Sequence, residues 1–240
     1  MDNFNVYKDI QARTKGEIYI GVVGPVRTGK STFIKRFMEL AVLPAMEDES
    51  LKAVSTDELP QSAGGKTVMT TEPKFIPKEA VQITLGDGIQ AKVRLIDCVG
   101  YMVDGAAGHV ENGEERMVKT PWSEKEIPFT QAAQIGTRKV IGDHSTIGIV
   151  VTTDGSVGEL KRSAYIDAEK QTVDELKKLG KPFILLLNST KPYSDETLKL
   201  AEQLAADYGV TVLPVSCEQL KKEDIFHILE SVLKEFPVTQ

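Results

Sequence analysis

One eight-residue segment near the start of the chain has the residue types and spacing of a phosphate-binding loop. It fits the pattern G-x-x-x-x-G-K-[ST] without a mismatch and reads Gly24, Pro25, Val26, Arg27, Thr28, Gly29, Lys30, Ser31, with Thr32 next. The glycines let backbone N–H groups approach an anion, Lys30 can reach the β- and γ-phosphates, and the Ser31 hydroxyl can bind Mg²⁺. The segment and Thr32 therefore predict a binding site for a nucleoside triphosphate.

The residues on either side of this loop predict the elements that such a site needs. Ile18–Val23 is apolar and rich in β-branched residues, which is typical of a buried parallel strand. Thr32–Leu40 places apolar residues at helical spacing. A helix that begins at the loop directs unpaired N–H groups at the anion. These flanks favour a phosphate loop over a chance match in an ordinary strand–turn–helix unit.

A second motif, Asp97-Cys98-Val99-Gly100, ends a predicted apolar strand with D-x-x-G spacing. The Asp97 carboxylate can orient Mg²⁺, through a water, while the Gly100 N–H can face the γ-phosphate. Thr70 and Thr71 lie between the two motifs, where a threonine would close on Mg²⁺ and the γ-phosphate, and Thr71 is a candidate Mg²⁺ ligand. The alternatives are a strand-end cap for Asp97 and the start of a strand for the threonines.

The residue after the second motif departs from the usual pattern. Many nucleotide switches carry glutamine there to orient the attacking water, but this chain has Tyr101. Tyrosine lacks the amide that holds water and phosphate together. We therefore expect slow intrinsic hydrolysis, or a water positioned by groups elsewhere, for example from a neighbouring subunit.

The segment that reads the base departs from the guanine-specific pattern N-K-x-D. It is Asn188-Ser189-Thr190-Lys191, so a cation replaces the aspartate that accepts hydrogen bonds from guanine. The next base-side segment, usually S-A-K, begins at Ser216 and continues with Cys217 and Glu218. Losing such acceptors removes selective contacts to guanine. We therefore predict ATP as the nucleotide, with Asn188 and Ser216 lining its site.

Arg27 is unusual because small residues or asparagine normally stand at its place in the loop. It could put a fixed positive charge near the β–γ bridge and act as an arginine finger in cis. The alternative is a side chain that faces solvent or contacts another subunit. Both readings stay open.

The composition is that of a soluble globular protein with no sign of a nucleic-acid partner. The 240 residues are 27% charged and 41% hydrophobic, and the net charge of -6 argues against nucleic-acid binding. Cys98 and Cys217 are the only cysteines, which predicts free thiols in a reducing cytosol rather than a disulfide. No apolar run approaches the roughly 20 residues that span a bilayer. Membrane association would therefore be peripheral or through a partner.

Strands and helices alternate along the rest of the chain, which predicts a P-loop α/β fold with a doubly wound, mostly parallel sheet. Val81–Leu85 and Ala91–Asp97 flank Gly86-Asp87-Gly88, a hairpin signal that predicts one antiparallel edge strand. The other predicted strands are Thr146–Thr152, Pro182–Leu187 and Val210–Val215. The predicted helices are Lys161–Leu179, Asp195–Tyr208 and Lys221–Phe236.

Two stretches exceed a minimal nucleotide-binding domain. One is Leu43–Lys66, which the threonine segment extends to about residue 71, and the other is Gly100–Phe129. Because loops of this length are usually functional, we interpret both as switch regions. The sequence is otherwise one domain over residues 1–240, and its end suggests the N-terminal part of a longer protein.

Several runs outside these generic motifs resemble the ATPase domain of the stage IV sporulation protein A family, spore coat morphogenetic proteins of endospore-forming Firmicutes. The resemblance covers nearly the whole chain. Its runs are Val26–Lys35, Asp57–Ala63, Met69–Phe75, Asp97–Tyr101, Thr120–Trp122, Ile135–Ile141 and His144–Gly148.

The resemblance implies a derived member of the translation-factor-like GTPase class that has switched to ATP and Mg²⁺. It implies that hydrolysis drives or locks self-polymerisation into a static shell on the outer forespore membrane, in the mother-cell cytosol. It also implies partners outside this chain's own copies, namely a small amphipathic membrane-anchoring peptide and other coat proteins, reached through regions absent here. The family assigns phosphate binding to Lys30, Mg²⁺ to Asp97 and sensing to Thr70 and Thr71.

Two other functional classes are alternatives to this one. A regulatory GTPase, for instance in ribosome assembly, is the main alternative, and the altered base-reading segment argues against it. A small-molecule kinase is the weaker alternative, because Asp97 and the two threonines suit a switch rather than an acceptor pocket with lid arginines.

Overall fold

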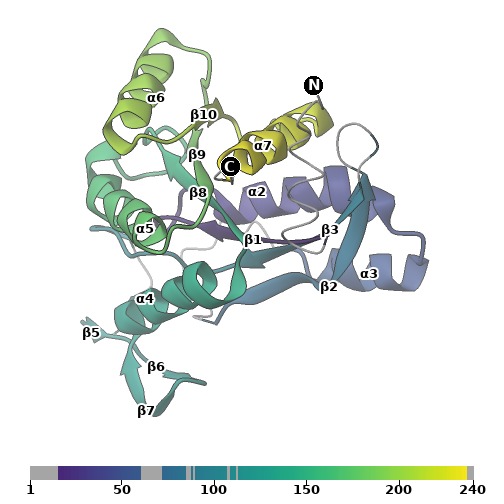
Figure 1. Cartoon of the computed structure of the whole chain (residues 1–240). Coiled ribbons are helices and arrows are strands. Elements are labelled where there is room, and N and C mark those ends of the chain that lie inside the picture. The colour runs from purple at the N-terminus through teal and green to yellow at the C-terminus, as the bar shows by residue number, and fades with distance from the viewer. Residues whose placement is uncertain are drawn as a thin grey trace.

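The fold is built on one six-stranded sheet (Figure 1). A computed structural model describes residues 16–60, 72–84, 88, 90–106, 109–111 and 113–236. The strand order is β10-β9-β8-β1-β3-β2. These strands are β1 (Glu17–Val23), β2 (Lys74–Thr84), β3 (Gln90–Asp97), β8 (Ile147–Thr153), β9 (Phe183–Asn188) and β10 (Val212–Val215). Neighbours pair in parallel except β2, which runs antiparallel to β3. The predicted fold class is confirmed, with its antiparallel edge strand.

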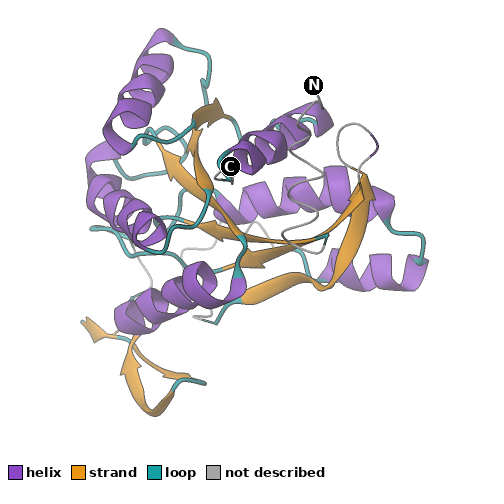
Figure 2. Cartoon of the chain, viewed as in Figure 1, coloured by secondary structure: helices purple, strands orange, loops and turns teal. Residues whose placement is uncertain are grey.

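Helices cover both faces of this sheet (Figure 2). They are α2 (Lys30–Phe37), α3 (Glu49–Asp57), α4 (Phe129–Lys139), α5 (Ile166–Lys178), α6 (Asp195–Tyr208) and α7 (Lys222–Lys234). Shorter helical turns are η1 (Met38–Val42), η2 (Leu43–Ala45), η4 (Val140–His144) and η5 (Arg162–Tyr165). Among the described residues, no helix has the length and apolarity needed to cross a bilayer.

Two hydrophobic clusters fill the space between the sheet and its helices. Successive residues of a strand face opposite sides of a sheet. Ile20 of β1 therefore lies in one cluster with Phe33 of α2 and Ile228 of α7, whereas Val23 lies in the other with Val173 of α5. Burial on both faces explains why the central strands are nearly continuous apolar runs.

Two α-helices in the described part of the chain were not predicted from the sequence, α3 in the first long stretch and α4 after the second. Helix α4 occupies the residues after the second long stretch and continues into the turn η4. Its buried side is Phe129 followed by the small residues Ala132, Ala133 and Gly136, so the apolar periodicity is weak. The predicted helix Lys161–Leu179 also differs, because it starts as the 3-10 turn η5 and becomes α-helical only in α5.

The two long stretches contain more regular structure than the sequence suggested. In the first, α3 begins after Asp48, whose side chain accepts hydrogen bonds from the backbone N–H groups of Ser50 and Leu51. The second contains two hairpins, one from β4 (Val110–Glu111) and β5 (Glu114–Glu115), the other from β6 (Met117–Thr120) and β7 (Ser123–Pro128). These hairpins project beyond α4 (Figure 1). Their predicted role as switches stays a prediction.

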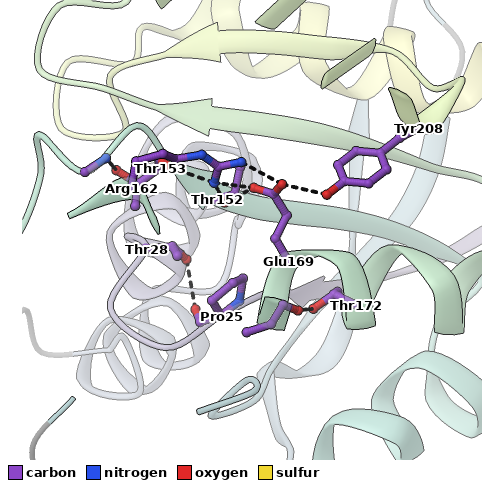
Figure 3. A network of polar contacts seen from close by, with 10 residues as sticks. Pro25, Thr28, Thr152, Thr153, Arg162, Glu169, Thr172 and Tyr208 are labelled. Atoms are coloured by element: carbon purple, nitrogen blue, oxygen red, sulfur yellow. Dashed lines mark hydrogen bonds and ion pairs between the residues drawn. The ribbon is translucent and has the colours of Figure 1, made fainter. Parts of the chain in front are cut away.

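A buried ion pair joins the end of β8 to α5 and α6 (Figure 3). The two guanidinium nitrogens of Arg162 donate to the Glu169 carboxylate at 2.5 and 2.7 Å, and Glu169 is completely buried. Tyr208 and Thr152 donate further hydrogen bonds to this carboxylate at 2.8 and 2.5 Å. The carbonyl of Thr153 accepts from Arg162 at 3.2 Å. The pair therefore fixes the chain where it leaves β8.

Replacing Glu169 with glutamine should destabilise the fold by about 3–5 kcal/mol, because it leaves the Arg162 side chain, which is only 19% exposed, without its counter-ion. The free energy of unfolding in denaturant would measure this loss. The matched control is Lys234→Ala, which breaks the exposed pair with Glu230, 2.9 Å apart, and should cost at most about 1 kcal/mol. Equal effects of the two substitutions would contradict the assignment of a structural role to the buried pair.

Candidate functional site

The phosphate loop lies between β1 and α2, at the carboxyl end of the sheet's central strand. Gly24 and Gly29 have φ values of 130° and 101°, which favour glycine. A Cβ atom on Gly24 would lie 2.3 Å from the Val151 carbonyl oxygen, and one on Gly29 would lie 2.3 Å from the Asn188 amide nitrogen. Both glycines of the motif are therefore required by close packing as well as by backbone conformation.

Lys30 begins α2 and is 5% exposed. Its ammonium group donates to the carbonyl oxygens of Pro25 at 2.6 Å and Gly24 at 3.3 Å. Burial lowers the pKa of Lys30, and the neighbouring Cys98 and Asp97 oppose this change. The cation is thus held within the loop by backbone carbonyls.

Asp97 ends β3 directly beside β1, where it pairs in register with Val22. Its Oδ1 atom is buried without a hydrogen-bond partner. Burial raises the pKa of Asp97 to about 6, against the lowering effects of Lys30 and Lys74. A desolvated carboxylate oxygen without a donor suits a divalent cation. Asp97 and the half-buried Ser31 hydroxyl in the first turn of α2 are therefore a fitting donor set for Mg²⁺.

The backbone after Asp97 contacts the phosphate loop directly. Gly100 has a φ of 92°, and a Cβ atom there would lie 2.0 Å from the Gly24 oxygen and 2.7 Å from the Lys30 nitrogen. The next residue, Tyr101, forms a parallel bridge with Pro25. The structure thus brings the second predicted motif against the first.

Asn188 links the loop to the end of β10. Its amide nitrogen donates to the Thr28 carbonyl at 2.9 Å, and its amide oxygen accepts from the Cys217 N–H at 3.0 Å. The side chain is 5% exposed. Thr28 also donates from its hydroxyl to the Pro25 carbonyl at 3.0 Å (Figure 3). Asn188 therefore positions the phosphate loop and places Ser216, the residue before Cys217, beside it.

The Ser189 hydroxyl is turned inward, where guanine-specific proteins have a lysine stem against the base. Ser189 is completely buried, and its hydroxyl accepts from the Lys191 N–H at 3.0 Å. The neighbouring Thr190 N–H donates to the Ser156 hydroxyl at 2.9 Å, and Ser156 in turn donates to Asp154 at 2.6 Å. The base-side segment is therefore held by hydroxyl groups and the Asp154 carboxylate. Lys191 is exposed.

Burial acts to raise the pKa of Asp154, but hydrogen bonds, among them those from the Ser156 hydroxyl and N–H, outweigh it and hold the pKa below its usual range. This carboxylate supports the predicted base-reading segment through Ser156 and was not itself predicted from the sequence. Asp154-Gly155-Ser156 follows a buried strand, which is a recognisable signal for a turn in which the aspartate side chain caps the backbone. This turn signal could have identified Asp154 from the sequence.

The structure brings most of the predicted site residues together. One region at the carboxyl ends of β1, β3, β9 and β10 is surrounded by the phosphate loop and by four further predicted residues, namely Asp97, Gly100, Asn188 and Ser216. The candidates Thr70 and Thr71 lie outside the described residues. Arg27 is exposed and has a φ of 61°, the one positive value for a non-glycine residue in the described part of the chain. Both readings of Arg27 remain predictions.

Both cysteines are free, as predicted, and the structure shows that both are buried. Burial raises the pKa of Cys98 to about 11 and that of Cys217 to about 12. The Cys98 thiol donates to the Val22 carbonyl at 3.6 Å, within reach of the site but packed into the sheet. Protonated, buried thiols are poor nucleophiles, so these side chains have structural roles.

Comparison with known proteins gives one consistent result. Residues 1–237 match the family model described as stage IV sporulation protein A, ATPase domain. The chain is similar to stage IV sporulation protein A of Bacillus subtilis (strain 168) and of Bacillus anthracis, each 52% identical over 240 residues, which are all of this chain and 49% of each relative. It is 53% identical to the Clostridioides difficile (strain 630) protein over 238 residues, 99% of this chain and 48% of that relative. The chain thus spans about half the length of these relatives.

Proposed function

The chain belongs to the stage IV sporulation protein A family, and from this membership we propose that it binds ATP with Mg²⁺ and hydrolyses ATP to ADP and phosphate. One observation carries the proposal. The buried Lys30 ammonium lies within a glycine loop that leads into a helix, and Asp97, with its unpartnered Oδ1 atom, ends the strand that pairs with β1 ahead of this loop. A cation and a free carboxylate oxygen at such a loop suit a metal-bound triphosphate.

Each residue of the site has a separate task in this reaction. The N–H groups of the loop and of the first turn of α2 bind phosphate oxygens, and Lys30 turns from the loop carbonyls to the β- and γ-phosphates. Asp97 and Ser31 would hold Mg²⁺, and the ion would supply positive charge to neutralise the phosphates. Asn188 keeps the loop in place through Thr28.

The base-side segment supports ATP rather than GTP as the nucleotide. Lys191 stands where a carboxylate would accept hydrogen bonds from guanine, and a lysine cannot accept them. Ser189 is buried and already engaged, so it cannot stack on a base. No acceptor pair remains at the positions that select guanine.

Nucleotide turnover, in this proposal, drives self-assembly of the protein. The relatives are named as stage IV sporulation proteins, and we place this chain in the coat layer on the outer forespore membrane, on the mother-cell side. The stretches 43–71 and 100–129 would change conformation with nucleotide state and alter subunit contacts. An amphipathic anchoring peptide and other coat proteins would bind parts of the longer protein.

The test combines turnover and sedimentation of the purified protein with ATP and Mg²⁺. We expect phosphate release and ATP-dependent pelleting from the wild-type chain, and neither from Lys30→Ala. Pelleting of Lys30→Ala to the wild-type extent, in a sample shown not to bind or hydrolyse ATP, would separate assembly from turnover. Turnover without pelleting would leave the ATPase and remove self-assembly by this domain.

A further inference from the structure

Tyr101 occupies the position at which many nucleotide switches carry a water-orienting glutamine. Its side chain is 1% exposed and packs in a small cluster of its own. The cluster consists of Val26, Tyr101, Val103, Ala106, Tyr165 and Ala168. A ring buried among apolar side chains cannot also orient a water at the phosphates. The side chain at this position has another task.

The backbone of Tyr101 is joined to the phosphate loop. Its carbonyl oxygen accepts a hydrogen bond from the Val26 N–H at 2.9 Å, and it bridges Pro25 in parallel. The preceding Gly100 is so close to Gly24 that no side chain would fit. Two segments about 75 residues apart in sequence thus share a strand-like contact, with Val26 and the tyrosine ring packed in the cluster beside it.

The Tyr101 hydroxyl is buried without a hydrogen-bond partner, and the charged groups of two helices act on it electrostatically. Arg138 of α4 donates to Glu175 of α5 at 3.0 Å. Burial raises the pKa of Tyr101 to about 12; Glu175 adds to the rise and Arg138 opposes it. The phenol is therefore neutral and lies where α4 and α5 meet. The ring is held between this junction and the phosphate loop.

We propose that Tyr101 is a positioning residue, which fastens the loop after Asp97 to the phosphate loop and so keeps Asp97 and Gly100 beside Lys30. The ring anchors the loop in the cluster, and the carbonyl joins it to Val26. This inference rests on the proposed ATPase function and deepens it. In other switches the residue at this position orients water. In this chain that residue, Tyr101, fixes the geometry of the phosphate site.

The competing account is an ordinary core tyrosine. Tyr165 provides a matched control because it is a completely buried tyrosine of the same cluster, but it lies in η5 rather than on the loop after Asp97. Replacing either tyrosine with leucine keeps a buried apolar side chain and removes the ring. If Tyr101 is only a core residue, the two substitutions should change kcat and the exchange of the Val26 amide to a similar extent. If Tyr101 positions the loop, only Tyr101→Leu should change them strongly.

Two readouts separate these accounts. One is kcat for ATP at saturating ATP and Mg²⁺, and the other is hydrogen exchange of the Val26 amide, followed by NMR without nucleotide. In Tyr101→Leu we expect kcat to fall by about ten- to a hundredfold and the Val26 amide to exchange at least about tenfold faster. In Tyr165→Leu we expect both to stay within about threefold of wild type. Equal changes in the two variants would overturn the proposal.

A third variant, Tyr101→Gln, restores the residue type that orients water elsewhere. We expect its kcat to fall as in Tyr101→Leu, because the side chain belongs to a buried apolar cluster; a higher kcat would overturn the proposal. In the wild-type protein, the Val26 amide should be protected from hydrogen exchange. Rapid exchange of this amide in the wild-type protein would overturn the proposal without any variant. Absence of wild-type turnover would instead refute the proposed ATPase function, and Val26 exchange would still decide the role of Tyr101.

Discussion

Lys30→Ala should reduce ATP hydrolysis by roughly two to three orders of magnitude, because it removes the ammonium group that meets the charge developing on the phosphates. Lys30 is the buried cation of the loop, held by the carbonyls of Pro25 and Gly24. Substitution also removes the positive neighbour of Asp97, so nucleotide affinity should fall together with turnover. Phosphate release and equilibrium ATP binding measure the two losses.

Lys35→Ala is the control for this substitution. Lys35 lies on the same helix and pairs with Glu39 at 3.9 Å, with 40% of its side chain exposed. Removing it changes the net charge by the same amount but leaves the loop intact, so turnover should stay near the wild-type rate. A similar loss in both variants would point to general electrostatics rather than to a specific phosphate contact. Wild-type turnover by Lys30→Ala would remove Lys30 from the mechanism.

Asp97→Asn should lower turnover by about a hundredfold or more at a fixed Mg²⁺ concentration, because an amide is a much weaker ligand for a hard cation. The substitution is nearly isosteric and removes a desolvated charge, so the free energy of unfolding without nucleotide should change little. The Mg²⁺ concentration that gives half-maximal turnover should rise. A titration of activity against Mg²⁺ measures this shift.

Asp104→Asn is the matched control for Asp97. Asp104 lies on the same loop and is exposed, so its substitution should not alter the Mg²⁺ dependence. If Asp97→Asn kept the wild-type Mg²⁺ dependence, the carboxylate would be a strand-end cap rather than a metal ligand.

The parts of the site that local sequence determines were predictable. The phosphate loop is one contiguous segment, and Asp97 follows a run of apolar residues that could only be a strand. The glycines at 24 and 29 are needed for backbone conformations that the loop itself imposes. Burial of the central strands on both faces also left a clear signal, so the sheet and its antiparallel edge were predicted.

The parts that depend on tertiary contacts were not predictable. Asn188 reaches Thr28 across 160 positions, and nothing near either residue indicates that bond. The burial of Tyr101 depends on η5 and α5, which supply Tyr165 and Ala168 to its cluster from another part of the chain. Helix α4 was missed because the small residues Ala132 and Gly136 pack closely and give little periodic signal.

The base-side segment was predictable in one respect and not in another. The replacement of N-K-x-D was evident, and it predicted the loss of guanine selectivity. The support of that segment by Asp154 and Ser156 was not predicted, because Ser156 lies 33 positions before Ser189 and 34 before Thr190 and meets them only in the folded protein. The sequence therefore indicated what the site lacks better than what holds it together.

A metal-bound triphosphate should bind this chain at a site that no longer selects guanine. Competition binding of ATP and GTP to the wild-type protein, with and without Mg²⁺, tests it most directly. We expect Mg²⁺-dependent ATP binding that is at least about tenfold tighter than GTP binding. Tighter binding of GTP, or no Mg²⁺-dependent affinity for ATP, would contradict the claim.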